Sequence, residues 1–229
     1  MSAPSDKTPL TLLSSLGEVG DIRTFVFETG GLAWTAGQAQ AYILPQAGPT
    51  PAEHERWFTI ASAPSEGVIH ISTRVSQSAF KQALNALKPG ATVERYDLGG
   101  KFVWEEVGGP VVLVAGGIGI TPFRSILLER QSAGKPLNAT LLHFNRTNEV
   151  PFQNTLQELA AVHPEFNVQT LVDERVTAEA ILNHAPEAKQ QTVYLSGPKP
   201  MVLAISAELE GQGVVVKQDR FPGYDETNY

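Results

Sequence analysis

The pattern of apolar and polar positions changes character near residues 108–110. Before this point, the apolar residues form short runs separated by glycine- and proline-containing turns, which is typical of antiparallel strands. A single helix is expected among them, because apolar side chains recur at helical spacing over residues 80–87, with Ser78 as a possible cap. The first part of the chain therefore predicts an antiparallel barrel or sandwich. The expected strands are Leu10–Leu13, Ile22–Phe27, Gln38–Leu44, Trp57–Ile60, Val68–Val75 and Thr92–Tyr96.

After residue 110, strands and helices alternate along the chain. Val111–Ala115 is a continuous run of small and β-branched residues, as expected of a strand buried on both faces. Alternation of this kind predicts a parallel, doubly wound sheet. We therefore expect an α+β two-domain fold, with an antiparallel β-barrel over residues 1–107 and a doubly wound α/β domain over residues 108–229. The later strands are expected at Ala139–Phe144, Asn167–Leu171, Thr192–Leu195 and Val214–Val216, and the later helices at Phe152–Val162, Thr177–Leu182 and Pro200–Leu209.

Composition excludes several kinds of function. The chain has 229 residues, of which 42% are hydrophobic and 18% charged, so it is an ordinary globular sequence. It contains no cysteine, which excludes disulfides, thiolate metal sites, iron–sulfur clusters and cysteine nucleophiles in this chain. The five histidines have no metal-ligand spacing, so we expect no metal site. A net charge of −7 without a lysine or arginine run argues against a nucleic-acid partner.

The termini and apolar runs bear on localisation. The first residues carry no apolar segment of the kind that a secretory signal needs. The longest apolar stretch, Val111 to Ile120, contains glycines and is too short to span a bilayer. We therefore expect a cytoplasmic protein without a membrane span.

A glycine-rich turn joins the first strand of the second domain to its first helix. Gly117-Ile118-Gly119 lets the backbone turn sharply and approach a ligand closely. Thr121 is expected to cap the helix, and Pro122 to occupy its first turn. Free N–H groups at a helix start suit a pyrophosphate. A tight turn without a ligand is the alternative, but the βαβ context favours a nucleotide site.

Two arginines bear on the choice of coenzyme. Dinucleotide folds usually place an acidic residue after the second strand, where it binds the ribose 2′-hydroxyl. This chain instead has Arg146 there, and Arg175 follows the third strand. A guanidinium suits a 2′-phosphate better than a hydroxyl, so we expect NADP, with NAD possible. The alternatives are solvated loop arginines, and for Arg175 a pairing with Asp173 or Glu174.

The segment Arg56-Trp57-Phe58-Thr59 resembles the Arg-x-(Tyr/Phe)-(Ser/Thr) flavin signature of the ferredoxin–NADP reductase family. In this family the first domain is a flavin-binding barrel and the second binds a nicotinamide coenzyme, so the resemblance covers nearly the whole chain. Segments similar to further family motifs follow in the family's order: Gly37-Gln38, Gly99-Gly100-Lys101-Phe102, Ser196-Gly197-Pro198 and Phe221-Pro222-Gly223-Tyr224.

For the first domain, the resemblance implies a set of flavin contacts. Arg56 would bind a flavin phosphate, Phe58 would pack against the isoalloxazine ring, and Thr59 would meet flavin N5. Phe58 stands where the family more often has tyrosine, and a core aromatic is the alternative role. The second flavin-contacting strand and the helix start after it would contribute Thr73, Arg74, Val75, Gln77 and Ser78.

For the second domain, the resemblance implies the nicotinamide contacts. Ser196 replaces the family's cysteine beside the nicotinamide, so we expect retuned hydride transfer there. Phe221 is expected just after the last strand, as the aromatic residue against the flavin. Thr59, Ser196 and Phe221 are thus the expected catalytic residues. The coenzyme would also contact the second-domain residues Gly197, Pro198 and Met201.

The resemblance implies an NAD(P)H-dependent flavoprotein oxidoreductase. Hydride would pass from nicotinamide C4 to flavin N5, with FAD favoured over FMN. Electrons would leave to a separate acceptor: a ferredoxin, a flavodoxin, a haem or oxygenase component, or a small molecule. Two alternatives stay open, a flavin reductase that uses free flavin and a non-enzymatic flavoprotein subunit that relays electrons. A surface patch of Lys81, Lys88, Arg95 and Lys101 is a further hypothesis for acceptor docking, against a solvated charged face.

Overall fold

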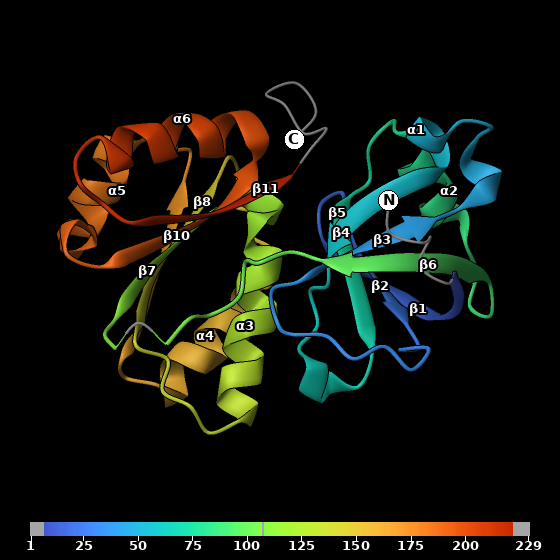
Figure 1. Cartoon of the computed structure of the whole chain (residues 1–229), viewed down its shortest axis with the longest axis horizontal. Coiled ribbons are helices and arrows are strands. Elements are labelled where there is room, and N and C mark those ends of the chain that lie inside the picture. The colour runs from blue at the N-terminus through green and yellow to red at the C-terminus, as the bar shows by residue number, and fades with distance from the viewer. Residues whose placement is uncertain (1–6, 107, 222–229) are drawn as a thin grey trace. The chain divides into compact units, whose positions relative to one another are not determined.

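A computed structural model describes residues 7–106 and 108–221. The chain forms two compact units, Met1–Val103 and Trp104–Tyr229. The division lies a few residues before the expected boundary at residue 107. Each unit is described by itself, and Figure 1 identifies its helices and strands.

The first unit is a curled antiparallel sheet of six strands, in the order β4-β3-β6-β1-β2-β5. Its two edge strands meet at a single bridge between Ile60 and Ile71, beside a hydrogen bond from the Ala61 N–H to the His70 carbonyl (3.0 Å). The predicted antiparallel barrel is therefore confirmed. The strands are β1 (Thr8–Val19), β2 (Ile22–Phe27), β3 (Ala39–Ile43), β4 (Glu55–Thr59), β5 (Ile69–Arg74) and β6 (Thr92–Gly99).

The interior of this unit is apolar and is covered by one helix. α2 (Ala79–Ala86) directs Phe80 and Leu84 into the barrel core, which matches the helix that the spacing predicts. Strand β1 runs well beyond the expected Leu13, because the chain turns only at Gly20, whose φ of +54° glycine adopts without strain. Short elements that the sequence pattern did not predict are η1 (Pro45–Ala47), α1 (Pro51–His54) and η2 (Pro64–Glu66).

The second unit is a parallel sheet of five strands with helices on both faces. The strand order β11-β10-β7-β8-β9 confirms the predicted doubly wound topology. Figure 1 shows α5 and α6 on one face and α3 and α4 on the other. The strands are β7 (Val111–Gly116), β8 (Ala139–Asn145), β9 (Phe166–Val172), β10 (Thr192–Pro198) and β11 (Val216–Phe221). The helices are η3 (Gly117–Ile120), α3 (Thr121–Ser132), α4 (Gln153–Val162), α5 (Ala178–His184), η4 (Pro186–Lys189) and α6 (Lys199–Glu210).

The last strand lies later in the sequence than its apolar residues suggest. The expected strand Val214–Val216 is wrong, because Val214 packs in the core beside α6 and Val215 is 61% exposed. β11 begins at Val216 and pairs in parallel with β10 through a mostly polar segment. Phe221 consequently lies within β11, opposite Pro198, and not after the strand. Residues 222–224 of the predicted aromatic segment lie outside the described residues.

In the described part of the chain, no helix combines the length and the apolar character that a membrane crossing requires.

Candidate functional site

The glycine turn of the second unit lies where the sheet changes its winding direction. β7 is flanked by β8 on one side and β10 on the other, so the connections after β7 and β10 diverge at the carboxyl edge. Ligands of doubly wound sheets bind in the crevice at this point. Gly117 adopts a φ of +53°, in the left-handed region that glycine tolerates. The structure therefore brings the predicted phosphate turn to the position where a nucleotide would bind.

The connections after β7 and β10 pack closely where they diverge, at the switch point of the sheet. This close packing explains why glycines are required there. A Cβ on Gly119 would lie 2.3 Å from the Ser196 carbonyl oxygen, so only glycine fits. Met201 covers the same point, since Cβ atoms on Gly116 and Gly197 would lie 2.8 Å from its sulfur and 2.6 Å from its Cε. The predicted residues of the β7 and β10 connections thus converge into one cluster.

The helix start after the glycine turn differs from the expectation. Thr121 does not cap α3, because the 3₁₀ turn η3 runs directly into the helix and Ile120 already has helical φ and ψ. The Thr121 hydroxyl instead donates back to the Ile118 carbonyl (3.2 Å) and is buried. Pro122 lies in the first turn as expected.

A buried histidine supports the glycine turn. His143 lies near the end of β8, and its Nε2 is 3.0 Å from the Gly117 carbonyl oxygen. Burial lowers the pKa of His143 to about 4, so the ring is neutral at pH 7 and its Nε2–H donates to that carbonyl. Sequence reasoning assigned His143 no role. Within residues 7–106 and 108–221, no three His, Asp or Glu side chains are grouped to hold a metal ion.

A serine–aspartate pair lies beside the glycine turn. Ser196 is fully buried, and its hydroxyl donates to Asp219 Oδ2 (3.1 Å) across the β10–β11 pairing. Burial raises the pKa of Asp219 to about 6, although hydrogen bonds from Ser196 and from the Arg220 backbone lower it. Sequence reasoning missed Asp219 because it placed the last strand too early. The sequence did contain a signal for this pair. Asp219 lies two positions before Phe221, and both belong to the strand that pairs with the Ser-Gly-Pro segment.

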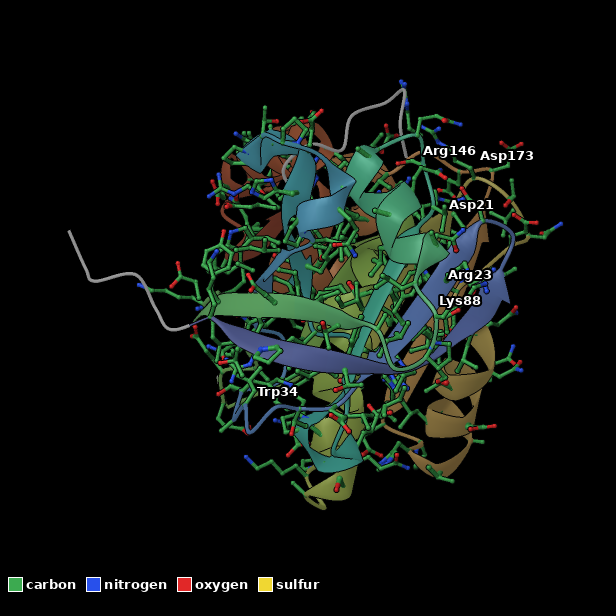
Figure 2. The ribbon with its side chains drawn as sticks, turned by 90° about the vertical axis from the view of Figure 1, so that its right-hand side faces the viewer. Asp21, Arg23, Trp34, Lys88, Arg146 and Asp173 are labelled. Atoms are coloured by element: carbon green, nitrogen blue, oxygen red, sulfur yellow. The ribbon has the colours of Figure 1, made fainter. Side chains whose placement is uncertain are left out.

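Both candidate coenzyme arginines lie at the carboxyl edge of the sheet. Arg146 and Arg175 are exposed and follow β8 and β9, which pair up to Asn145 and Val172. Figure 2 shows Arg146 near Asp173, whose N–H donates to the Asn145 carbonyl (2.9 Å). The Glu174 carboxylate binds His184 Nε2 (3.0 Å).

In the first unit, the predicted flavin residues lie on the two edge strands. From the Ile60–Ile71 bridge, β4 runs back to Arg56 and β5 runs forward to Arg74, so both arginines lie at the same end of the barrel. The Arg56 guanidinium donates to the carbonyls of Glu55 (2.7 Å) and Ala52. Arg74 forms an ion pair with Asp21.

The other predicted strand residues surround this end. Thr59 and Thr73 are buried, and the Val75 N–H donates to the Asp21 carbonyl (2.9 Å). Phe58 is only 9% exposed and packs between Tyr42 and Phe80, with ring centroids 6.1 Å and 5.7 Å away. Phe58 thus belongs to the barrel core in this structure, and its stacking on a flavin stays a prediction.

The start of α2 completes this cluster. Ser78 occupies the N-cap position, but it makes no side-chain capping bond, and its buried Oγ has no partner among the described residues. Gln77 beside it is exposed. Lys81, expected on a surface patch, is only 6% exposed, so that expectation is wrong. Burial lowers the pKa of Lys81 to about 8, as do the charges of Arg56 and Arg74, whereas Asp21 raises it.

Known proteins resemble both units. Residues 113–207 match the family model described as "Oxidoreductase NAD-binding domain". A flavohemoprotein of Burkholderia sp. (strain TH2) is 30% identical over 184 residues, covering 74% of this chain and 46% of the relative. Ferredoxin–NADP reductase B of Sorangium cellulosum is 34% identical over 148 residues, covering 62% of this chain and 56% of the relative. The chain spans about half the length of the curated relatives it matches.

Solved structures extend the likeness to the first unit. A ferredoxin–NADP⁺ reductase from Neisseria gonorrhoeae, with bound FAD and NADP, superimposes with a TM-score of 0.78 at 16% identity. The match covers 93% of this chain and 98% of that protein, so both units share its fold. Residues 113–207 thus match an oxidoreductase NAD-binding domain, and the two units together have the fold of ferredoxin–NADP reductase-type FAD/NAD-binding proteins.

Proposed function

We propose that this chain is a flavoprotein reductase that oxidises NAD(P)H and passes the electrons to a separate acceptor. The observation that carries the proposal is the glycine turn at the switch point of the second unit, packed against Ser196 so closely that Gly119 can carry no side chain. A backbone that approaches this closely beside a helix start suits a dinucleotide pyrophosphate. The first unit would add a second anion-binding site, which is formed by side chains and not by a glycine turn.

The first unit fits a flavin phosphate. Arg56 and Arg74 can each offer charge-assisted hydrogen bonds, and the unpartnered Ser78 Oγ lies at the start of α2. Gln77 and Val75 would complete this phosphate contact, and Thr73 would line the second flavin-contacting strand. We propose FAD as the flavin, supported by the reductase from Neisseria gonorrhoeae, which shares the fold and binds FAD.

The proposed catalytic residues are two with hydroxyl groups, Thr59 and Ser196, and one aromatic residue, Phe221. A flavin and a nicotinamide, when bound, supply a hydride acceptor and a hydride donor. The Thr59 hydroxyl would orient flavin N5, and Phe221 at the end of β11 would face the flavin ring. Ser196 would lie beside the nicotinamide, where its hydroxyl donates a hydrogen bond to Asp219 and keeps the Oγ lone pairs available.

The coenzyme and the acceptor are also proposed. Ile118, Thr121 and Pro122 would line the pyrophosphate site together with Gly117 and Gly119, and Gly197, Pro198 and Met201 would line the nicotinamide side. Because the chain has no cysteine, it carries no cysteine-ligated iron–sulfur cluster of its own. We therefore propose a separate acceptor of the ferredoxin, flavodoxin, haem or oxygenase class.

Absorbance spectroscopy tests the proposal. The purified protein, loaded with FAD and gel-filtered, should keep its yellow colour and bleach when NADPH is added without other proteins. A colourless protein that reduces added flavin would point to a flavin reductase instead. A yellow protein that neither NADPH nor NADH bleaches would favour a relay subunit and overturn the proposed enzyme activity.

A further inference from the structure

His143 is an unusual residue for an inner strand of a parallel sheet. It lies on β8, next to β7, and it is fully buried, as are its chain neighbours Leu142 and Phe144. A buried polar group costs free energy unless it is hydrogen-bonded, and an apolar side chain would fill the same place without that cost. The imidazole therefore needs an explanation other than packing.

Strand pairing places His143 in a row with residues that flank the glycine turn. Successive residues of a strand point to opposite faces of the sheet. Leu142 and Phe144 pack in the core cluster with α5 and α6, so His143 faces the other side, where Figure 1 shows α3. Ala115 lies opposite it on β7, and Ser196 lies opposite Ala115 on β10. The glycine turn follows β7 directly, so it has His143 on one side and Ser196 on the other.

The two ring nitrogens of His143 differ in their surroundings. Nε2 lies 3.0 Å from the carbonyl oxygen of Gly117, whereas Nδ1 is buried and has no partner among the described residues. A carbonyl can only accept a hydrogen bond, and burial keeps the ring neutral at pH 7, so the proton lies on Nε2. The hydrogen bond to Gly117 is therefore what this side chain contributes beyond its volume.

The carbonyl that His143 holds belongs to a peptide that glycine leaves free to rotate. Gly117 adopts a φ of +53°, and glycine populates positive and negative φ about equally readily. The peptide that joins Gly117 to Ile118 can therefore turn over at little steric cost. In a trans peptide the C=O and the N–H point in opposite directions. With the Gly117 carbonyl held toward β8, the Ile118 N–H points away from β8.

We propose that His143 is a positioning residue for the coenzyme, because its Nε2–H holds the Gly117 carbonyl and thereby presents the Ile118 N–H to the pyrophosphate. The identity of the ligand rests on the proposed function, whereas the orientation of the peptide rests on the hydrogen bond. His143 itself does not touch the ligand. Its removal should therefore weaken binding of the pyrophosphate group and leave hydride transfer within the bound complex unchanged.

Two substitutions separate the donor from the ring. His143→Gln keeps an N–H donor at about the reach of Nε2, whereas His143→Phe keeps a ring without a donor. Because the Gly117 carbonyl loses its partner, His143→Phe should bind NADP⁺ roughly ten- to a hundredfold more weakly. KM for NADPH should rise by a similar factor, while kcat stays within about twofold of wild type. His143→Gln should keep both parameters within about threefold of wild type.

The experiment combines titration calorimetry with NMR of the backbone amides. Calorimetry gives the dissociation constants of NADP⁺, of inorganic pyrophosphate, and of 2′-AMP, which has no pyrophosphate and should bind all variants equally. Thr170→Val is the matched control, since Thr170 lies opposite His143 on β9 and is exposed. In NMR, the Ile118 amide signal should shift when pyrophosphate binds wild type. If His143→Phe does not fold, this shift and the affinity of His143→Gln still decide the question.

The outcomes separate this inference from the proposed function. Weaker binding of NADP⁺ and pyrophosphate by His143→Phe, with near-wild-type binding by His143→Gln, supports the inference. A wild type that binds pyrophosphate but neither NADP⁺ nor NAD⁺ would overturn the proposed function, and the same difference between the variants, measured with pyrophosphate, would still support the inference.

Three results would overturn the inference and leave the proposed function standing. The first is NADP⁺ binding that neither substitution of His143 changes. The second is an equal loss in His143→Gln and His143→Phe, or a loss that Thr170→Val shares. The third is an Ile118 amide signal that bound NADP⁺ and bound pyrophosphate both leave in place.

Discussion

At the scale of single residues, the Ser196–Asp219 pair gives the structure a titrating carboxyl near the glycine turn. The folded protein holds the pKa of Asp219 at about 6, above its ordinary value of 3.8, because the side chain is buried. Between about pH 4 and pH 6 the folded state therefore binds more protons than the unfolded state. The free energy of unfolding should accordingly fall as the pH rises through this window.

Asp219→Asn should remove this dependence, since the amide cannot ionise. Wild type should lose unfolding free energy from pH 4 to pH 7, whereas the variant should not. The difference between the variant and wild type should therefore grow by about 2–3 kcal/mol over this range. Urea unfolding of both proteins at several pH values measures the difference. Asp173→Asn, an exposed change in the same unit, is the matched control. A constant difference across the pH range would contradict the assignment of this carboxyl.

Arg56 offers a second test at the residue scale. Arg56→Ala removes one charge-assisted contact, so flavin affinity should fall roughly ten- to a hundredfold. The measurement is the flavin content after dialysis and the dissociation constant by fluorescence. Arg23→Ala, on β2 with its guanidinium 3.3 Å from the Ser15 hydroxyl, is the matched control. A full flavin complement in the Arg56 variant would show that this guanidinium does not bind the phosphate.

At the scale of elements, apolar periodicity predicted the elements that have a buried face and failed where burial is weak. The continuous run of β7 and the helical spacing of α2 both match the structure. β11 was placed too early because it is an edge strand with polar residues such as Lys217 and Asp219. Such a strand shows no apolar pattern. Thr121 was misassigned because the 3₁₀ turn η3 moves the helix start upstream, and turn geometry of that kind leaves no sequence signal.

The segment before β7 is held onto the second unit by an aromatic cluster. The Trp104 ring stacks on Tyr194, with centroids 6.2 Å apart and planes 15° apart, and the Arg130 guanidinium lies 4.1 Å from its centroid. Arg130 also binds Glu106 (2.8 Å), and the Tyr194 hydroxyl accepts the Glu105 N–H (3.0 Å). These contacts explain why residues 104–106 belong to the second unit.

Trp104→Ala should therefore destabilise the second unit. The loss of the ring stacking and of the cation–π contact together should cost about 1–3 kcal/mol in unfolding free energy. Trp104→Phe keeps a stacking ring and should lose less than half of that. Urea unfolding followed by circular dichroism gives both values. Equal stability of Trp104→Ala and wild type would mean that this segment contributes nothing to the fold.

At the scale of the whole molecule, the order of motifs along the chain was more informative than any single motif. The flavin-like signature on β4 and the glycine turn after β7 were each ambiguous alone, but their order predicted the two units that the structure contains. What the sequence could not reveal was burial. Lys81 and His143 look like surface residues by type, and only the folded chain brings them inside. Asp219 likewise gains its neighbour Ser196 only through the pairing of β10 with β11.

We expect coenzyme choice to depend on the carboxyl edge of the second unit. Arg146 and Arg175 follow adjacent parallel strands, and the Glu174 carboxylate binds His184. If both guanidiniums bind a 2′-phosphate, each should contribute roughly ten- to a hundredfold in preference. We therefore expect higher kcat/KM for NADPH than for NADH, and tighter binding of 2′-phospho-AMP than of AMP.

The Arg146→Ala, Arg175→Ala double variant tests this preference. It should lose most of the discrimination by raising KM for NADPH, while kcat/KM for NADH stays within about twofold, because the adenosine end takes no part in hydride transfer. Lys189→Ala is the matched control, since Lys189 is exposed in the turn that leads into β10, at the amino edge of the sheet. Calorimetry with 2′-phospho-AMP and AMP reports the same preference without turnover. A wild-type preference for NADH, or a ratio that the double change leaves untouched, would identify both arginines as solvated loop residues.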